Sequence, residues 1–209
     1  MPDSATPRFR TVLIIVGRQN GTTHLCVVLT LYWQFIERQR LIVGTSTNLG
    51  YVKESWQKAI DLAEETPSLA VDIPTNGSHK AAGEECFTTV DGCRYLIKAS
   101  NRCGGRSLTL NRLILDELRE HADWSAWGAA TNAMNAVPDA QAVAITNSLR
   151  NSALDDIETG DGDPRLCILE WSAPPGPSPP TSTRSPRRTL TSASGSRSTP
   201  CLVLRTGRS

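Results

Sequence analysis

A short aliphatic run that leads directly into a glycine-containing loop constrains the fold of this chain more than any other feature. Residues 11–16 read TVLIIV, which is typical of a strand buried on both faces of a parallel sheet. The loop that follows is Gly17-Arg18-Gln19-Asn20-Gly21-Thr22-Thr23, and an apolar helical segment begins at its end. A strand, a tight loop and a helix in this order are the unit from which parallel α/β sheets are built.

This loop carries part of a phosphate-binding pattern. Such loops direct backbone N–H groups and a helix N-terminus at phosphate oxygens, with the pattern G-x-x-x-x-G-K-[ST]. Gly21 holds the last glycine position, and Thr23 holds the position of the hydroxyl that binds Mg²⁺. Val16 stands at the first glycine position and Thr22 at the lysine position, so the pattern fails twice. A strand-turn-helix in which Gly21 serves only packing is the alternative.

A second aliphatic run ends in two carboxylates. Residues 110–115 form the predicted strand, and Asp116 and Glu117 follow it, about 95 residues after the loop. At a strand end, Asp116 can hold Mg²⁺ through water, and Glu117 can orient the attacking water. A later strand ends in Thr146 and Asn147, where a polar side chain can sense the γ-phosphate of ATP. The alternative for the carboxylates is a solvated pair.

Alternating strand and helix patterns place the chain in the α/β class. We expect a P-loop NTPase-like parallel sheet with helices on both faces in residues 11–171, after a frayed N-terminus at residues 1–10. Expected helices span residues 23–39, 49–66, 120–135 and 148–158, and further expected strands span residues 41–45, 86–90, 93–99, 142–147 and 165–171. The first of these helices is apolar almost all round and is expected to be buried on most sides.

Local signals mark several boundaries within this pattern. Asn48 is expected to cap the second helix, and Pro67 is expected to end it. Asp91-Gly92 lies between two short strands, which predicts a hairpin.

Composition excludes a zinc site and a membrane span. The six cysteines form no CxxC pair, and Cys26 and Cys167 lie in apolar runs that indicate core thiols. His24, His79 and His121 form no cluster and are expected to be structural. The longest apolar run is too short for a bilayer, which needs about 20 residues. With no signal peptide, we expect a cytoplasmic protein.

Charge is distributed unevenly along the chain. Six of the 22 Lys and Arg residues lie beyond Trp171, where there is no Asp or Glu, so the body carries 16 basic and 21 acidic residues. A net negative charge over residues 1–171 does not indicate DNA binding driven by basic residues. Residues 172–209 are rich in Pro, Ser, Thr, Arg and Gly, and we expect them to be disordered.

Together these segments resemble the ATPase domain of the large terminase subunit, the DNA-packaging motor of tailed bacteriophages. In that family the loop commonly reads R-Q-x-G-K-[ST], without the first glycine. Arg18, Gln19, Gly21 and Thr23 match this form, and Thr22 replaces its lysine. The resemblance extends over about residues 7–174 and includes the Gly104-Gly105-Arg106-Ser107 segment and the helix that carries Trp124 and Trp127.

The resemblance implies ATP and Mg²⁺ as cofactors. Mg²⁺ is then held by Thr23 and Asp116, and Glu117 orients water. Arg18 is expected to donate to the γ-phosphate in place of the lysine, unless it is an ordinary solvated loop residue. The implied nucleotide-binding set is Gly17, Arg18, Gln19, Asn20, Gly21, Thr22, Thr23, Thr146 and Asn147. Arg102 or Arg106 is a candidate arginine finger that would contact ATP bound to a neighbouring subunit. The alternative is a solvent-exposed arginine at the end of a hairpin.

The implied partners are double-stranded phage DNA, the small terminase subunit and the portal, in a homo-oligomer on the procapsid in the host cytoplasm, with no membrane. Three departures point to a truncated copy with weak or no ATPase activity: the lysine is Thr22, the upstream adenine-contacting segment has no room, and the nuclease domain is absent. Alternatives are a non-catalytic prophage relic or a helicase-like P-loop ATPase. The Arg18-Gln19 pair favours a terminase.

The tail has a possible origin in a shifted reading frame. In the family, an acidic helix rich in Ala and Leu follows this position. GC-rich codons for Asp-Leu-Asp-Ala-Leu-Ala-Ala-Ala, read one base later, give TSTRSPR, the sequence of residues 181–187. A genuine disordered basic linker is the alternative.

The site also carries a geometric expectation. The strands that precede Gly17 and Asp116 should lie side by side and parallel, because the carboxyl ends of parallel strands meet at one crevice. Thr23 and Asp116 should then be close enough to share one Mg²⁺ with its water shell, with Thr146 or Asn147 on the neighbouring strand end.

Overall fold

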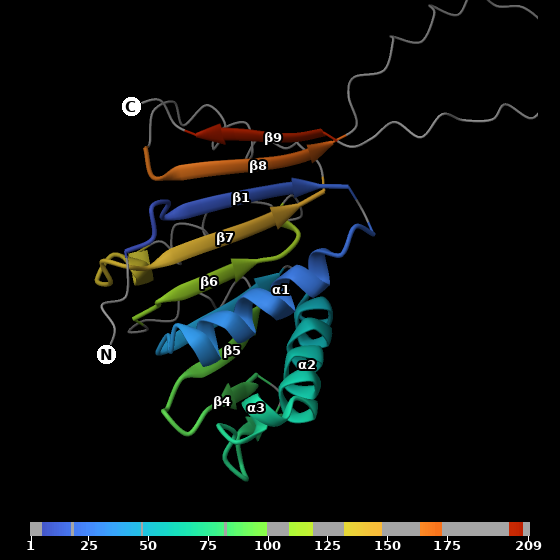
Figure 1. Cartoon of the computed structure of the whole chain (residues 1–209), viewed down its shortest axis with the longest axis vertical. Helices are drawn as coiled ribbons and strands as arrows, with labels where there is room; N and C mark the ends of the chain where they lie inside the picture. The colour runs from blue at the N-terminus through green and yellow to red at the C-terminus, as the bar shows by residue number, and fades with distance from the viewer. Residues whose placement is uncertain are drawn as a thin grey trace, which may run out of the picture.

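In the computed structural model of this chain, the described strands form one twisted sheet (Figure 1). The structure describes residues 6–17, 19–46, 48–81, 83–99, 109–118, 132–147, 164–172 and 201–206. In chain order the strands are β1 (Thr11–Val16), β2 (Leu41–Ser46), β3 (Ser78–His79), β4 (Cys86–Thr88), β5 (Arg94–Ala99), β6 (Arg112–Leu115), β7 (Gln141–Thr146), β8 (Leu166–Ser172) and β9 (Cys201–Thr206). Their order across the sheet is β3-β4-β5-β2-β6-β7-β1-β8-β9.

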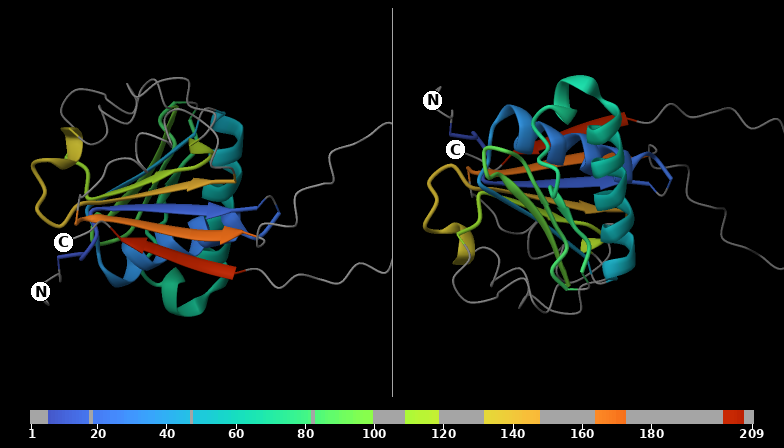
Figure 2. Two further views of the ribbon diagram at one scale, coloured as in Figure 1. Left: turned by 90° about the horizontal axis from the view of Figure 1, so that it is seen from above. Right: turned by 90° about the horizontal axis from the view of Figure 1, so that it is seen from below.

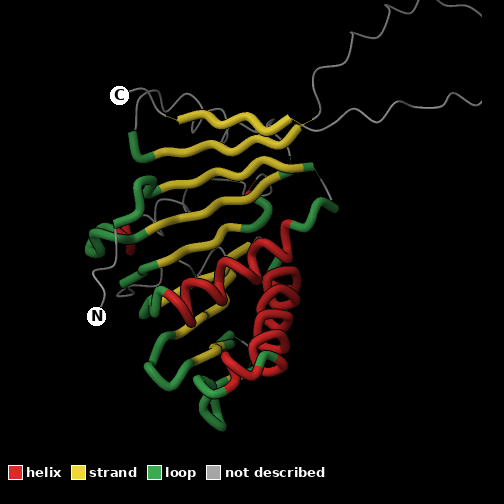
Figure 3. The backbone as a smooth tube through the Cα atoms, viewed as in Figure 1, coloured by secondary structure: helices red, strands yellow, loops and turns green. Residues whose placement is uncertain are grey.

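The centre of the sheet is parallel. β1 pairs with β7 on one side and with β8 on the other, and β2 pairs in the same way with β5 and β6. β6 and β7 are also parallel neighbours, whereas β3, β4 and β9 add antiparallel pairs at the two ends. The carboxyl ends of β1, β6 and β7 therefore share one edge of the sheet, where their arrowheads lie in Figure 1. Figure 3 shows the strands side by side, with the helices near one part of the sheet.

Apolar side chains cover both faces of the sheet. The helical elements are α1 (Thr22–Leu31), its π-helical continuation η1 (Tyr32–Ile36), α2 (Leu49–Glu65) and α3 (Pro67–Ala70). α1, η1 and α2 pack with Ile42, Ile114 and Ile145 in one core cluster, which includes Trp56 from α2. Figure 2 shows the ribbons of these helices beside the sheet. The alternate residues of the same strands, such as Val43, point to the other face.

A second core cluster lies on that other face. This cluster contains Leu113 and Leu115 of β6 and Leu13 of β1, together with Met134 and Val137. Burial on both faces explains why these strands are aliphatic at nearly every position. The predicted α/β class is confirmed, and the predicted parallel sheet is parallel at its centre with antiparallel pairs at both ends. The helices expected at residues 120–135 and 148–158 lie mostly or wholly outside the described residues.

The first helix differs from its prediction in length and in burial. Its helical turns end at Ile36, before the expected end at residue 39, and Arg38 then takes a left-handed φ of 56°. A left-handed residue is a common way for a helix to stop. Exposed apolar side chains run along it at intervals of three or four residues: Leu25, Val28, Tyr32 and Ile36. The expectation of burial on most sides is wrong for this face of the helix.

The two ends of the chain are more ordered than composition predicts. Cys201–Thr206 forms β9, which pairs antiparallel with β8, so the expectation that all of residues 172–209 is disordered is wrong for this strand. Its sequence, CLVLRT, is aliphatic enough for a strand. At the other end, Arg10 donates from Nη2 to the carbonyl oxygen of Met134 over 2.6 Å, and the Phe9 carbonyl accepts from Gln141. These two residues are therefore not frayed.

Several local predictions are confirmed. Asn48 caps α2, because its Oδ1 accepts from the N–H of Gly50 over 2.9 Å. α2 ends at Glu65, and Pro67 begins the short α3. β4 and β5 are antiparallel neighbours, joined through Gly92 with a φ of 78°. Within the described residues, no helix has the length and apolarity required to cross a membrane.

Candidate functional site

The loop between β1 and α1 turns through two left-handed residues. Gln19 has a φ of 59° and Gly21 a φ of 81°. The Asn20 side chain donates from Nδ2 to the carbonyl oxygen of Gly17 over 3.0 Å and so closes the turn. α1 begins at Thr22, and its N-terminus has no side-chain cap. The first N–H groups of the helix are therefore donors of the kind that phosphate loops direct at an anion.

The two carboxylates follow β6 through a strained turn. The N–H of Asp116 donates to the carbonyl oxygen of Thr45 on β2 over 2.9 Å, which fixes the end of the strand. The N–H of Glu117 then donates to Oδ1 of Asp116, also over 2.9 Å. Glu117 has a φ of 55°, a left-handed conformation that costs a residue with a side chain about 1–3 kcal/mol.

Asp116 is partly removed from water. Burial raises the pKa of its carboxyl group, and the hydrogen bond from the Glu117 N–H opposes that effect without cancelling it. Within the described part of the chain, no Lys or Arg forms an ion pair with Asp116. A desolvated carboxylate without a cationic partner is the chemistry of a metal ligand.

β7 separates the loop strand from the carboxylate strand. Ile15 of β1 is paired with Thr146 of β7, and Leu115 of β6 is paired with Ala144 of the same strand. The expectation that β1 and β6 are neighbours is therefore wrong. Three aliphatic parallel strands look alike in sequence, and the pattern does not encode which pair is adjacent. The expected parallel orientation and the shared edge are confirmed, and Thr146 lies between the loop and the carboxylates.

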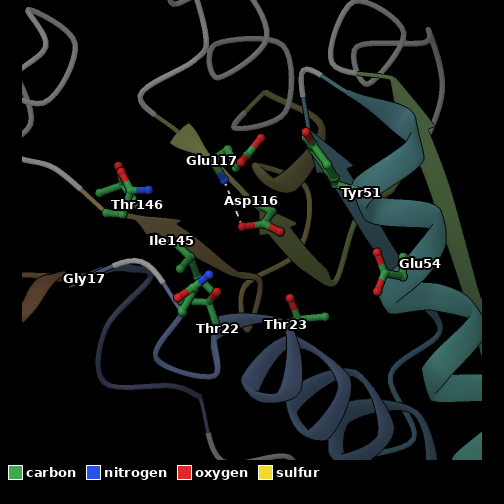
Figure 4. Close-up of a pocket in the computed structure, with 11 residues that line it drawn as sticks. Gly17, Thr22, Thr23, Tyr51, Glu54, Asp116, Glu117, Ile145 and Thr146 are labelled. Carbon is green, nitrogen blue, oxygen red and sulfur yellow. Dashed lines mark hydrogen bonds between the residues drawn. The ribbon is translucent and has the colours of Figure 1, made fainter.

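These strand ends and the loop enclose a cavity of about 490 Å³ (Figure 4). Its lining residues are Gly17, Gln19, Thr22, Thr23, Tyr51, Glu54, Asp116, Glu117, Ile145, Thr146 and Asn147. Of the residues singled out in the sequence, Asn20 and Gly21 do not line it, and Arg18 lies outside the described residues. Oδ1 of Asn147 is buried there without a hydrogen-bond partner among the described residues.

Two lining residues come from α2 and carry no motif. Tyr51 and Glu54 lie three positions apart, on the side of the helix opposite the buried stripe that includes Val52 and Trp56. The sequence contained one signal for them, because their helix follows an expected strand of the parallel sheet. β2 is parallel to β6, so the helix after β2 must begin at the same sheet edge as Asp116.

The remaining sequence predictions are structural. Among the described residues, no three His, Cys, Asp or Glu side chains are grouped to hold a metal. Cys26 and Cys167 are buried free thiols, as predicted, and Cys86 and Cys93 are free thiols in the hairpin region. Nε2 of His79 lies 3.7 Å from Oε2 of Glu84. Arg102, Arg106, His121, Trp124 and Trp127 lie outside the described residues.

A largely parallel sheet, a turn into an uncapped helix and two carboxylates at the same sheet edge place a candidate ligand site where open α/β sheets bind their ligands. No protein-family model and no curated protein matches the chain. Solved structures do match, and they show that the chain has the fold of large terminase ATPase domains. The resemblance inferred from the sequence is thus confirmed at the level of the fold.

Three of these structures illustrate the match. The HK97 bacteriophage large terminase is 18% identical with a TM-score of 0.64, covering 79% of this chain and 36% of that one. The Thermus phage P74-26 large terminase ATPase domain is 16% identical with a TM-score of 0.54, covering 69% and 62%. The large terminase of a thermophilic bacteriophage, in complex with ADP, is 12% identical with a TM-score of 0.56, covering 78% and 40%. This chain thus spans about a third of the HK97 protein.

Proposed function

We propose that this chain is the ATP-binding domain of a large terminase-type DNA-packaging motor, and that Thr22 leaves it with weak or no ATP hydrolysis. The proposal rests above all on the convergence of the loop, both carboxylates and Thr146 on one cavity of about 490 Å³. Ligands of open α/β sheets bind at the carboxyl ends of strands. A solved structure with the same fold contains ADP, which supports a nucleotide as the ligand.

The phosphates of ATP fit the loop. Gly21 reaches its φ of 81° without strain because it lacks a Cβ, and the turn leads into the uncapped N-terminus of α1. The partial positive charge of a helix N-terminus attracts phosphate. Gln19 and Thr22 line the cavity on this side.

Mg²⁺ fits between the start of α1 and the end of β6. Thr23 and Asp116 both face the cavity, and they would hold the ion through the threonine hydroxyl and the carboxylate. The part-buried carboxylate of Asp116 and the Oδ1 of Asn147, which has no hydrogen-bond partner among the described residues, support a polar ligand in this part of the cavity. Mg²⁺ supplies charge neutralisation at the phosphates when bound. Glu117 would accept a hydrogen bond from water and orient it, and Thr146 would contact the γ-phosphate.

Thr22 limits the rate. In place of a lysine ammonium, it offers the phosphates an uncharged hydroxyl. Loss of one transition-state donor costs ~10²–10³ in rate, and loss of a charged one at least as much. Nucleotide binding depends less on this position, because the backbone donors of the loop do not change with the side chain.

Binding of a fluorescent ATP analogue with and without Mg²⁺ tests the proposal. We expect the natural chain to bind in the presence of Mg²⁺ with ATP turnover near background, and Thr22→Lys to bind more tightly. Asp116→Asn should remove the Mg²⁺-dependent part of the affinity. The control is Asp91→Asn, the same change in an exposed hairpin. Failure of both the natural chain and Thr22→Lys to bind would overturn the proposal in favour of a non-catalytic relic.

The wider assignment rests on the resemblance. From it we propose four partners or states: double-stranded phage DNA, the small terminase subunit, the portal, and a homo-oligomer on the procapsid in the host cytoplasm. We also propose that the ATPase domain spans residues 11–171 and that the sequence beyond it is translated in a shifted reading frame. A helicase-like ATPase would differ in its response to DNA: unwinding of a duplex with a single-stranded end by Thr22→Lys would favour that alternative.

A further inference from the structure

The nucleotide cavity is acidic. Three of its lining residues are carboxylates, namely Glu54, Asp116 and Glu117, and none of its lining residues within the described part of the chain is Lys or Arg. The loop position that holds a lysine in phosphate-binding loops is Thr22. Polyphosphate in such a cavity is repelled by the carboxylates unless a cation opposes them. One Mg²⁺ would neutralise only part of this charge, so a further cation close to the cavity would favour binding of the phosphates.

Lys58 on α2 is placed to supply that cation. Its Nζ lies 2.6 Å from Oε1 of Glu54, and Glu54 lines the nucleotide cavity. Lys58 also lines a second cavity of about 440 Å³, together with Gly21 and Thr23 from the start of α1. Its ammonium is therefore one hydrogen bond from a residue that lines the nucleotide cavity, and its side chain faces the same second cavity as the start of α1.

Other lysines near this edge are held elsewhere. Lys53, one turn earlier on α2, pairs with the buried Glu85 at 3.4 Å. Lys98 of β5 donates to the carbonyl oxygen of Gly83 over 2.9 Å. Lys58 is different because its ion pair among the described residues is with a residue that lines the nucleotide cavity. A four-carbon stem lets its ammonium move without movement of the backbone.

We propose that Lys58 provides the positive charge to the nucleotide phosphates that Thr22 does not. Glu54 holds the ammonium at the rim of the cavity, and the ammonium transfers its hydrogen bond to a phosphate oxygen when nucleotide binds. The proposal rests on the proposed function, because it assigns the phosphate-binding cation of that same site. The lysine charge then reaches the bound phosphates from α2, whereas the loop itself still lacks its charged transition-state donor at Thr22.

The alternative is an ordinary surface ion pair. Glu54 and Lys58 are spaced i,i+4 on a helix, and such exposed pairs contribute little to stability. A surface pair of this kind has no effect on nucleotide affinity. Binding therefore separates the two interpretations, whereas thermal stability does not.

The experiment measures the dissociation constant of a fluorescent ATP analogue with Mg²⁺ for the whole chain. Lys58→Gln should weaken binding about tenfold or more, the effect expected for one charged hydrogen bond. Lys58→Arg should keep most of the affinity. Lys80→Gln is the matched control, because it removes the same charge from an exposed loop between β3 and β4, and it should leave affinity unchanged. Equal affinity of Lys58→Gln and the natural chain would overturn the proposal.

A double-mutant cycle with Thr22→Lys makes the result specific. If Lys58 replaces the loop lysine, then Lys58→Gln should cost clearly less in the Thr22→Lys background than in the natural chain. Equal losses in both backgrounds would overturn the replacement. Binding by Thr22→Lys but not by the natural chain would also overturn it, while leaving the nucleotide site intact. Absence of binding by both would overturn the site and the Lys58 proposal together.

Discussion

The backbone N–H of Glu117 donates to Oδ1 of Asp116 over 2.9 Å, and Glu117 makes this bond from a left-handed φ of 55°. Adjacent residues of a regular strand point to opposite faces. Here both side chains line the same cavity, because the left-handed turn redirects the second one. The strain at Glu117 is thus the cost of placing two carboxylates at a single strand end.

That strain can be measured by replacing Glu117 with Gly and with Ala. Both substitutions remove the carboxylate, but only glycine adopts the left-handed region freely. We expect Glu117→Gly to be about 1 kcal/mol more stable than Glu117→Ala, in keeping with the cost of a left-handed residue. Urea unfolding measures this difference. Equal stability of the two variants would show that the turn relaxes when the carboxylate is removed.

Glu85 should make stability depend on pH. Burial acts to raise the pKa of Glu85, but hydrogen bonds from its own backbone N–H, Lys53 and the Gly83 N–H outweigh it and lower that pKa. A lowered pKa stabilises the fold above the unfolded-state value, and this contribution is lost as pH falls through the folded value. We expect Glu85→Gln to cost about 1–3 kcal/mol at pH 7.

The cost of that substitution should shrink as pH falls through the lowered pKa of Glu85, where the carboxylate of the natural chain becomes protonated. Thermal unfolding of both proteins from about pH 3 to pH 8 measures the difference. Glu64→Gln, an exposed position on α2, serves as the control. A difference that stays constant across this range would mean that Glu85 is not held as a carboxylate.

Cys26 should resist alkylation in the folded protein. Burial, with a smaller effect from the charge of Asp116, raises the pKa of the Cys26 thiol to about 12. Since the thiolate is the nucleophile, iodoacetamide at about pH 8 should modify the half-buried Cys86 first. Mass spectrometry of the digested protein measures both sites, and unfolding in guanidinium should make them equally reactive. Rapid labelling of Cys26 in the native protein would reveal opening between α1 and the sheet.

Removal of residues 201–209 should destabilise the fold. β9 pairs with β8 from Cys201 to Thr206, so its loss exposes the backbone edge of β8 to water. Because the truncation removes several backbone hydrogen bonds between β8 and β9, we expect the free energy of unfolding to fall by at least about 1 kcal/mol. Urea unfolding of a chain that ends at Pro200 measures this. Superimposable unfolding curves would support the prediction from composition that the whole tail is disordered.

The sequence determined the local parts of this protein. The strand of residues 11–16, the Asn48 cap and the Asp91-Gly92 hairpin follow from nearest-neighbour rules of backbone conformation, and the structure confirms each of them. The loop and the carboxylates were recognisable because particular residue types occupy consecutive positions. The burial of β6 and β7 on both faces was also readable, since nearly every position is aliphatic or small.

Only the tertiary structure decided how these parts meet. It placed β7 between β1 and β6, it paired Cys201–Thr206 with β8, and it left one face of α1 in water. It also brought Tyr51 and Glu54 to the cavity, with Lys58 one hydrogen bond away. Strand order and helix docking depend on contacts between residues far apart in the chain. A period of two or 3.6 shows that a face is apolar but not which partner will cover it.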